Sequence, residues 1–210
     1  MTRRKRELSN NLINRLPQYL TYLKELDKDS YVSALEVANS LNLNFELVKK
    51  DFQKISSKRG VPNKGRRVDD LINGIEKLLG FDENHRAILV GVGHLGNALL
   101  NYQGFKQYNL EIVGAFDYNK ELIGKTINGI NIYDFDDISS IRRKLNATIG
   151  IICVPASEAE GVAIRLVASG IEAIWNFAPV RLDVNDDVIV SNMDMAQSLA
   201  NLAHRLYIKK

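Results

Sequence analysis

Three glycines and one aspartate form the most chemically informative pattern in this sequence. Gly91, Gly93 and Gly96 follow an apolar run, 88–90, with the spacing Gly-x-Gly-x-x-Gly. An apolar-rich segment of helical character comes next, and a second apolar run ends at Asp117, 21 residues after the last glycine. A strand, a glycine-rich turn, a helix and a second strand ending in an acid are the pattern of dinucleotide-binding proteins.

Each part of this pattern has its own physical role. Gly91 permits a tight turn, Gly93 lets a pyrophosphate approach the backbone, and Gly96 lets the helix pack against the strand. The helix N-terminus offers free N–H groups and a positive dipole end to the phosphates. Asp117 is expected to accept hydrogen bonds from the adenosine ribose and to repel a 2′-phosphate, so the pattern favours NAD over NADP. The alternative is an ordinary glycine-rich turn without a ligand.

The strands and helices around this motif must build the sheet that positions it. Short apolar runs at 130–133, 148–154, 171–177 and 188–191 predict strands, and 136–145 predicts a helix. Ser157-Glu158-Ala159-Glu160 has the pattern of a capping box, which predicts a helix that starts there and ends at Gly170. Strands that alternate with helices predict a parallel sheet with ligands at the strand carboxyl ends.

Composition limits the class of protein. The chain has 210 residues, 45% of them hydrophobic, and no apolar run approaches the roughly 18 residues that span a bilayer. The basic start, 3–6, leads into a polar helical pattern unlike a signal peptide, so we expect a cytoplasmic protein without a membrane partner. Cys153 is the single cysteine, which excludes an internal disulfide and a cysteine-rich zinc site.

Charge is distributed unevenly along the chain. Residues 1–80 hold 16 Lys and Arg against 10 Asp and Glu, whereas residues 81–210 hold 12 against 15. This asymmetry predicts a small basic module facing nucleic acid, joined to a larger acidic one. We therefore expect a DNA-binding domain at 1–80 and a nucleotide-binding domain at 81–193, followed by a terminal helical segment at 194–210.

The basic module has the pattern of a helix-turn-helix. Leucines at helical spacing predict a helix over 9–26, and Pro17 should kink it or begin a second one. Ser33 and Glu36 form a capping box, and Asn44 is a good N-cap for a recognition helix over 45–55. We expect three apolar side chains of that helix to face the core, namely Phe45, Val48 and Phe52.

A basic cluster extends from the recognition helix into the following turn. Between 49 and 67 there are eight basic residues and one acid, Asp51, and the glycines and proline of 58–67 predict a wing. A solvated charged face is the alternative. No row of aromatic residues interleaves the charges, so the pattern favours double-stranded DNA over single strands. The predicted DNA contacts are Lys49, Lys50, Lys54, Lys58, Arg59, Lys64 and Arg66.

Two further helices complete the expected fold. Val68 to Leu79 predicts a helix that Gly80 ends, and 80–85 is the expected boundary between domains. A last helix is predicted from Met195 to Ile208 with apolar residues on one face. It can pack on its own domain or cross to a partner subunit, and the sequence leaves these two alternatives open.

With these motifs identified, the chain resembles the redox-sensing transcriptional repressor Rex family over nearly its whole length. The matching motifs are Arg15-Leu16-Pro17-x-Tyr19, Leu23-x-x-Leu26, Val48-Lys49-Lys50-Asp51, Lys58-Arg59-Gly60-Val61, Gly91-x-Gly93-x-Leu95-Gly96, Asn101-Tyr102-x-Gly104-Phe105, Ala115-Phe116-Asp117, Val154-Pro155-Ala156, Asn176-Phe177-Ala178-Pro179 and Asn192-x-Asp194. The resemblance implies an α/β protein: an N-terminal winged-helix domain, a Rossmann-type domain and a swapped C-terminal helix in a homodimer.

The resemblance also implies a function. Such a repressor binds its operator when free or with NAD⁺, and NADH closes the dimer and releases the DNA. The departures lie mainly in the DNA reader: Lys49 replaces an arginine, 55–57 replaces a Phe-Gly-x-x-Gly stretch, and 62–65 is inserted after the wing valine. The family's operator preference therefore does not transfer directly to this chain.

The predicted cofactor site combines the glycine motif with residues that the resemblance supplies. The resemblance implies that His94 helps to connect Tyr102 to the partner's Asp194, and that Met195 lies against the nicotinamide; a plain turn residue and core packing are the alternatives. Cys153 is expected to be a buried small hydrophobe, with a reactive thiol as the alternative. The full predicted site is Gly91, Val92, Gly93, His94, Leu95, Gly96, Tyr102, Asp117, Val154, Pro155, Phe177, Asp194 and Met195.

Two classes of function compete. A small NAD-dependent oxidoreductase needs a proton donor or acceptor near the nicotinamide and room for a substrate. The nucleotide fold takes up nearly all of 81–192, and neither a Tyr-x-x-x-Lys pair nor a His–carboxylate pair is visible in the later strands. A module that senses NADH without consuming it fits better, so we expect a regulator and not an enzyme, with no metal site.

Overall fold

The computed structural model describes residues 8–56, 58–81 and 83–209. The chain divides into two compact units, Met1–Glu83 and Asn84–Lys210. Each is described by itself.

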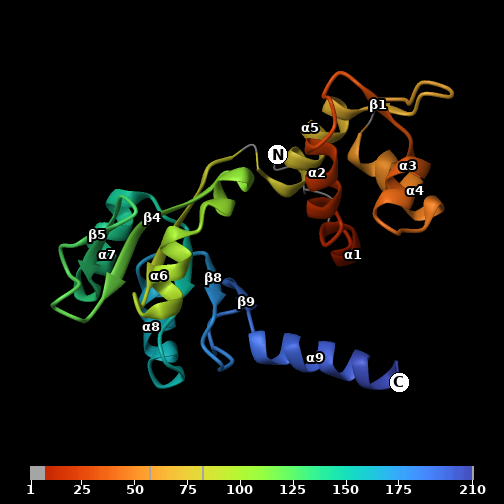
Figure 1. Ribbon diagram of the computed structural model, residues 1–210. Coiled ribbons are helices and arrows are strands. Elements are labelled where there is room, and N and C mark those ends of the chain that lie inside the picture. Colours follow the sequence, from red (N-terminus) through yellow and green to blue (C-terminus); the bar gives the residue numbers. More distant parts are fainter. Residues whose placement is uncertain (1–7, 57, 82, 210) are drawn as a thin grey trace. The chain divides into compact units, whose positions relative to one another are not determined.

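The first unit contains a helix-turn-helix. Its helices are α1 (Asn10–Ile13), α2 (Leu16–Lys24), α3 (Ala34–Ser40), α4 (Phe45–Ile55) and α5 (Val68–Leu79) (Figure 1). Pro17 lies in the first turn of α2, which confirms the predicted break between two helices. The Ser33–Glu36 capping box is present, Asn44 accepts from the Leu47 N–H, and Gly80 ends α5 in the left-handed region, so these three predictions are confirmed.

The wing is a short two-stranded ribbon. Strand β1 (Tyr31–Val32) pairs antiparallel with β2 (Arg66–Arg67), and a single bridge joins Val61 to Gly65. Gly65 has φ +91° and lies against the Val32 carbonyl, so a side chain would not fit there. The wing was predicted, but β1 was not, because two residues show no periodicity.

The core of the first unit is made by α2, α4 and α5. The prediction that Phe45 belongs to it is wrong, because this side chain is 39% exposed. It starts α4, and its ring lies 5.5 Å from the Lys49 ammonium, whereas Val48 and Phe52 are buried as predicted. Other fully buried members are Leu16, Tyr19, Leu20, Leu23, Leu71 and Ile75.

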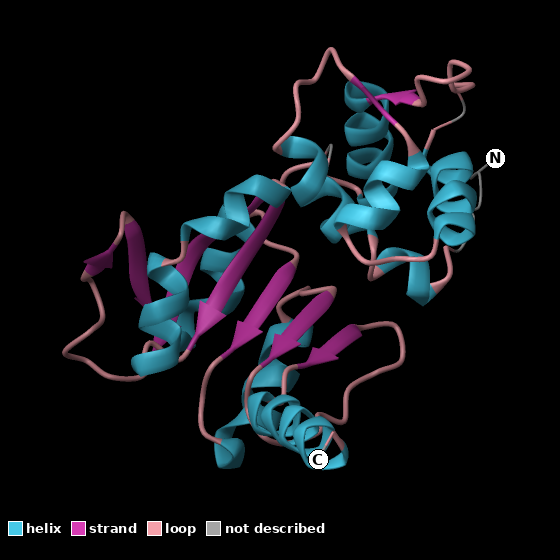
Figure 2. Cartoon of the chain, turned by 45° about the vertical axis from the view of Figure 1, so that its right-hand side comes forward, coloured by secondary structure: helices cyan, strands magenta, loops and turns pink. Residues whose placement is uncertain are grey.

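The second unit is built on a seven-stranded sheet in the order β5-β6-β4-β3-β7-β8-β9. Its strands lie side by side in Figure 2, and all pair in parallel except the edge strand β5. The bounds are β3 (His85–Val90), β4 (Leu110–Asp117), β5 (Thr126–Ile127), β6 (Ile130–Asp134), β7 (Ile149–Ile152), β8 (Ala173–Asn176) and β9 (Ile189–Asn192). This is the doubly wound order of dinucleotide-binding domains, which confirms the predicted Rossmann-type sheet.

Helices complete two apolar layers. One buried cluster joins Leu100 of α6 (His94–Asn101) to Ala87 and Leu89 of β3. The other joins α7 (Ile138–Leu145) and α8 (Ala156–Ala168) to Ile88 and Val90 of the same strand. Alternate residues of β3 therefore serve opposite faces. Short 3₁₀ helices, Gln103–Tyr108 and Phe135–Asp137, follow α6 and precede α7.

The predicted capping box at Ser157 is wrong. Helix α8 begins at Ala156, and its N-cap is Pro155, two residues before Ser157, with no capping side chain. The fixed φ of proline already suits a chain entering a helix, so the helix starts directly after the strand-to-helix turn.

The last helix, α9 (Met195–Ile208), has the predicted bounds and contains no buried residue. Its N-cap is Asp194, whose carboxylate accepts from the Gln197 N–H at 2.8 Å. Figure 1 shows α9 projecting beyond the end of β9. None of the described helices is long and apolar enough to cross a membrane.

Candidate functional site

A crevice opens in the second unit where the strand order reverses. The chain runs from β3 outward to β4 and β6, and then returns to the other side of β3 with β7. Ligands of doubly wound sheets bind at such a reversal, outside the strand carboxyl ends. The crevice has a volume of about 310 Å³ and is lined by Val90, Gly91, Gly93, Asp117, Tyr118, Cys153, Val154, Pro155, Glu158 and Val162.

The three glycines of the Gly-x-Gly-x-x-Gly motif have different surroundings. Gly91 has φ +96° and lies against the Cys153 carbonyl, and a side chain at Gly96 would collide with the Gly91 carbonyl oxygen. A side chain at Gly93 would meet nothing within 4 Å. The first and third glycines are therefore required by the fold. The second leaves open space in front of α6, where the predicted pyrophosphate would lie.

Two helix N-termini are at or next to this space. Gly93 and Pro155 are the N-caps of α6 and α8, and neither receives a capping side chain in the described part of the chain. Uncapped first turns offer N–H groups and a positive dipole end to an anion. His94, Leu95 and Gly96 form the first turn of α6, directly after the crevice residue Gly93.

Asp117 ties the second strand to the glycine turn. One carboxylate oxygen accepts from the Val92 N–H at 2.7 Å, and the other accepts from the Asn119 N–H at 2.8 Å. A carboxylate has about four lone-pair sites, so it keeps acceptor capacity for ribose hydroxyls. The neighbouring strand ends in Asp134, whose pKa is lowered mainly by its hydrogen bond from Lys120 at 2.6 Å.

Sequence reasoning missed the aromatic and cationic wall beside Asp117. Tyr118 lines the crevice and packs edge-on against Phe135, with ring centroids 5.1 Å apart. Arg165 of α8 donates to the Tyr118 hydroxyl at 2.7 Å and lies 4.2 Å from the Phe135 ring. These residues come from three separate segments, and no local sequence pattern joins them.

Cys153 lies in the crevice wall with its thiol partly buried. Burial raises the pKa of this thiol to about 12. At neutral pH it is therefore protonated, which favours the predicted role as a small hydrophobe over that of a reactive thiol.

Tyr102 and Phe177 do not line the crevice, but a row of aromatic rings joins them. Tyr102 packs edge-on against Phe105 at 4.9 Å, Phe105 against Trp175 at 5.9 Å, and Trp175 against Phe177 at 4.4 Å. The row runs from the end of α6 to the end of β8. Tyr102 itself is 57% exposed.

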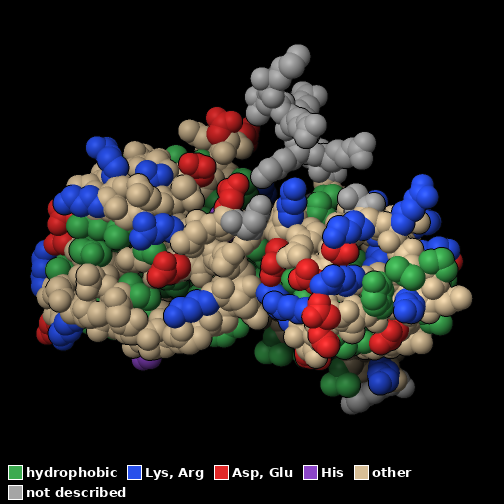
Figure 3. All heavy atoms as spheres, turned by 90° about the horizontal axis from the view of Figure 1, so that it is seen from above, with side chains coloured by type: hydrophobic (Ala, Val, Ile, Leu, Met, Phe, Trp, Pro, Cys, Tyr) green, Lys and Arg blue, Asp and Glu red, His purple; other side chains and the backbone are tan. Residues whose placement is uncertain are grey.

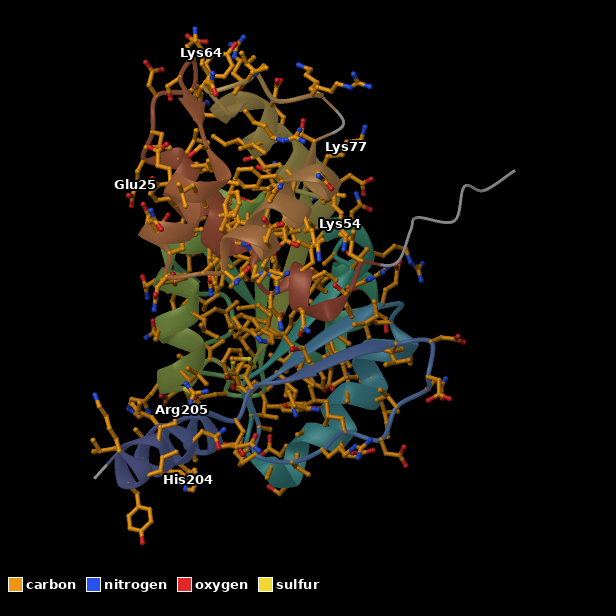
Figure 4. All side chains as sticks on the ribbon, turned by 90° about the vertical axis from the view of Figure 1, so that its right-hand side faces the viewer. Glu25, Lys54, Lys64, Lys77, His204 and Arg205 are labelled. Carbon is orange, nitrogen blue, oxygen red and sulfur yellow. The ribbon has the colours of Figure 1, made fainter. Side chains whose placement is uncertain are left out.

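The last two predicted cofactor residues also lie outside the crevice. Asp194 and Met195 line a separate groove of about 620 Å³ along α9, together with Leu199, Leu202 and Arg205. Met195 is 58% exposed. Figure 4 shows the side chains of α9, among them His204 and Arg205, standing out from the helix.

The predicted DNA contacts of the first unit separate into two groups. Lys58 is paired with Asp70 at 2.5 Å, Arg66 donates to the carbonyls of Ser56 and Lys58, and Lys49 lies 3.7 Å from Glu46. Figure 3 shows acidic side chains among the basic ones of this unit. For the other predicted contacts, namely Lys50, Lys54, Arg59 and Lys64, the described residues include no ion-pair partner. Lys64 projects from the tip of the wing in Figure 4.

The one acid of the basic cluster, Asp51, is buried. Arg15 donates to both of its oxygens, at 2.8 and 3.1 Å, and the Tyr19 hydroxyl donates at 2.9 Å. Burial, followed by the hydrogen bond to Asp51, raises the pKa of Tyr19 to about 12. Asp51 therefore fastens the recognition helix α4 to α2, and sequence reasoning did not assign it this role.

Together these features define a class: a winged-helix unit with a basic surface, joined to a Rossmann-type unit with a glycine-rich crevice. Two family models match the chain. One, "Putative DNA-binding protein N-terminus", matches residues 7–53, and the other, "CoA binding domain", matches residues 82–180. The first matched segment lies in the first unit, and the second lies in the second unit apart from its first two residues.

Individual relatives give the family. The redox-sensing transcriptional repressor Rex of Bacteroides fragilis is 38% identical over 92% of this chain and 89% of its own length. Rex of Clostridium novyi is 35% identical over 97% of both chains. A crystal structure of RSP, described as in complex with beta-NAD⁺ and operator DNA, matches with a TM-score of 0.89, 34% identity, and coverage of 98% of this chain and 95% of that one. The chain belongs to the Rex family of redox-sensing transcriptional repressors.

Proposed function

We propose that this chain is a DNA-binding repressor that senses the NADH/NAD⁺ ratio and releases its operator when NADH binds. The observation that carries this proposal is the match over nearly the full chain to a repressor solved with beta-NAD⁺ and operator DNA, which is also described in complex with beta-NADH. Because a repressor acts on the chromosome, the proposal places the protein in the cytoplasm.

The crevice of the second unit fits the cofactor. The uncapped start of α6 and the open space at Gly93 suit a pyrophosphate, and Asp117 suits the adenosine ribose. The Asp117 carboxylate at the end of β4 disfavours a 2′-phosphate, so we infer NAD(H) and not NADP(H). When the dinucleotide is bound there, its nicotinamide would be either oxidised or reduced. The protein would respond to that difference without catalysing a reaction of the cofactor.

The first unit fits duplex DNA. Lys50 and Lys54 project from the exposed part of α4, and Arg59 and Lys64 extend the charge along the wing. The recognition helix would enter the major groove, and the wing would follow the phosphate backbone. Lys58 and Arg66 make intramolecular contacts and would hold the wing in place, with Lys58 also within reach of a phosphate.

We further propose that α9 pairs two copies of the chain. Leu199, Leu202 and Leu206 are each more than 60% exposed, which is unusual for leucines on one helix face. A second copy covering this face would form a homodimer, and it would bring the partner's Asp194 and Met195 to the nicotinamide side of the crevice. Tyr102, exposed at the end of α6, is the candidate contact for the partner's Asp194.

The decisive experiment is fluorescence anisotropy of a labelled operator, selected from a random duplex pool because the wing departs from the family pattern. The proposal predicts tight binding without cofactor or with NAD⁺, and at least tenfold weaker binding at saturating NADH. A tenfold change requires only about 1.4 kcal/mol of preference, which one or two hydrogen bonds supply. DNA affinity that is unchanged by NADH would refute the proposed sensing.

A second assay addresses the enzyme alternative. Curated relatives are repressors, so we propose that this chain binds NADH without oxidising it. Absorbance of NADH should stay constant with a panel of small carbonyl compounds. Steady turnover of any of them would favour the oxidoreductase.

A further inference from the structure

Asn176, at the end of β8, is a fully buried polar residue whose hydrogen bonds join the 177–180 loop to the strand end that leads into α9. Its exposure is 0%, and a buried amide must satisfy its donors and acceptor within the protein. Its side-chain oxygen accepts from the Ala178 N–H at 3.0 Å. Its nitrogen donates to the Val180 carbonyl at 2.8 Å and to the side-chain oxygen of Asn192 at 2.9 Å, with a longer contact to the Ala178 carbonyl at 3.3 Å.

The backbone of Asn176 makes the connection firmer. Its carbonyl accepts from the Met193 N–H at 2.8 Å, and β8 pairs in parallel with β9, placing Asn176 opposite Asn192. One residue after Met193, Asp194 caps the first turn of α9. A short run of hydrogen bonds thus leads from the 177–180 loop to the start of the terminal helix.

The other side of Asn176 leads towards the cofactor crevice. Phe177, the next residue, ends the aromatic row that starts at Tyr102, and its N–H donates to the Ile152 carbonyl at 3.0 Å, directly before the crevice residue Cys153. The start of the loop after β8 therefore bonds the residue before the crevice wall, and Asn176 links the same loop to the segment that leads into α9.

We infer that the Asn176–Asn192 pair is a positioning brace, which makes the orientation of α9 follow the conformation of the 177–180 loop. The inference rests on the proposed function and deepens it: contacts at the nicotinamide side of the crevice would reach the dimer helix through this amide pair. Without the Asn176–Asn192 hydrogen bond, the 177–180 loop would move without moving α9.

Asn192 offers a test that spares the core, because its own residue is exposed whereas Asn176 is buried. Asn192→Ala removes the acceptor of the brace. Asn192→Asp keeps an oxygen in the same position and should restore it. Ser191→Ala changes the preceding exposed residue of β9 and is the matched control.

The first readout is the ratio of operator dissociation constants with and without NADH. Because losing one hydrogen bond can weaken coupling by about fivefold, Asn192→Ala should lower this ratio by three- to tenfold, while Asn192→Asp and Ser191→Ala stay within twofold of wild type. Binding of NADH in the absence of DNA should persist. A ratio for Asn192→Ala equal to that of wild type would overturn the brace.

The second readout is hydrogen exchange of the full chain without ligands, which does not depend on the proposed function. The amides of Ala178, Met193 and Gln197 should exchange at least threefold faster in Asn192→Ala than in Ser191→Ala. If wild-type operator binding ignores NADH, the proposed sensing fails, and this exchange pattern alone decides whether the brace exists. Unchanged protection at all three amides would refute it.

Discussion

Removing the buried carboxylate of the recognition helix should destabilise the DNA-binding unit more than any surface charge of that helix. Asp51 is 2% exposed and receives three hydrogen bonds, two from Arg15 and one from Tyr19. Asp51→Ala would leave the Arg15 guanidinium without its counter-charge and the Tyr19 hydroxyl without its acceptor. Breaking a buried ion pair on one side costs about 3 to 5 kcal/mol.

The geometry places the expected cost at the lower end of that range. The Arg15 side chain keeps 17% of its exposure, so water can reach part of the guanidinium once the acid is gone. We expect a loss of about 3 kcal/mol in the free energy of unfolding, which lowers the midpoint of a unit of this size by more than about 10 °C. DNA binding at a temperature where the unit is folded should fall less, because Lys50 and Lys54 remain.

The assay can separate the two units. Trp175 is the single tryptophan and lies in the second unit, so its fluorescence follows that unit, whereas far-ultraviolet circular dichroism follows both. Asp51→Ala should lower the midpoint temperature of an unfolding transition seen by circular dichroism. The midpoint of the transition seen by tryptophan fluorescence should stay unchanged. Glu46→Ala is the matched control, because the Glu46–Lys49 pair lies on the same helix, is more than half exposed on both sides and is worth at most about 1 kcal/mol.

Two results would refute this reasoning. One is a loss below about 1 kcal/mol for Asp51→Ala, the value expected of a surface pair. The other is additivity: if Arg15→Leu and Asp51→Leu together cost the sum of the single changes, the two side chains are not coupled.

Four further predictions concern the glycine crevice, cofactor choice, pH and the wing. Gly96→Ala should lower the free energy of unfolding of the second unit by about 1 to 3 kcal/mol, because the new side chain meets the Gly91 carbonyl. Gly93→Ala should leave the thermal midpoint of that unit nearly unchanged and still weaken NADH binding in calorimetry. Equal thermal midpoints for the two variants would contradict this. Asp117→Ala should narrow the preference for NADH over NADPH, and wild-type protein that binds both equally would remove the argument. Because the pKa of Tyr19 is raised from 10.0 to about 12, folding favours the neutral form of its hydroxyl. This contribution to the free energy of unfolding is complete below pH 10 and should be lost between pH 10 and 12. Alkaline denaturation of Tyr19→Phe should not show this loss. Asp70→Asn should free Lys58 of the wing from its ion pair and raise DNA affinity up to about fivefold. For the wild type, the logarithm of the DNA association constant should fall with the logarithm of salt concentration at a slope of about −5 if about six phosphates are neutralised.

Local signals predicted much of the fold. Ser33, Asn44 and Gly80 act within one helical turn, so their caps could be identified from neighbouring residues alone. Ser157 shows the limit of such signals: residues 157–160 fit the sequence pattern of a capping box, but the strand before them leads into a helix that already begins at Ala156, with Pro155 as its N-cap. Phe45 shows a second limit: it fits the apolar pattern of α4, yet it is the first residue of the helix and stays at the surface.

Half of the predicted site follows from local sequence and half does not. The glycine turn and Asp117 are joined by one βαβ unit, so their proximity was predictable and the Val92–Asp117 hydrogen bond fits it. Tyr118 after β4, Phe135 after β6 and Arg165 of α8 meet only through the tertiary fold, because they come from separate segments of the chain. Asp194 and Met195 lie away from the crevice of their own chain, and only the resemblance, not their spacing, gave them a role.

If a second copy of the chain covers the terminal helix, as proposed above, this repressor would be sensitive to its own abundance. An isolated helix of about 14 residues is marginal in water, and α9 buries no side chain against its own unit. If a second copy completes it, folding of the helix and association of the chains are one equilibrium, shifted by mass action. At low copy number the chains would separate and α9 would unfold. Operator occupancy would then drop more steeply than the protein concentration. The cell could then reset the repressor's threshold through its rate of synthesis as well as through the cofactor pool.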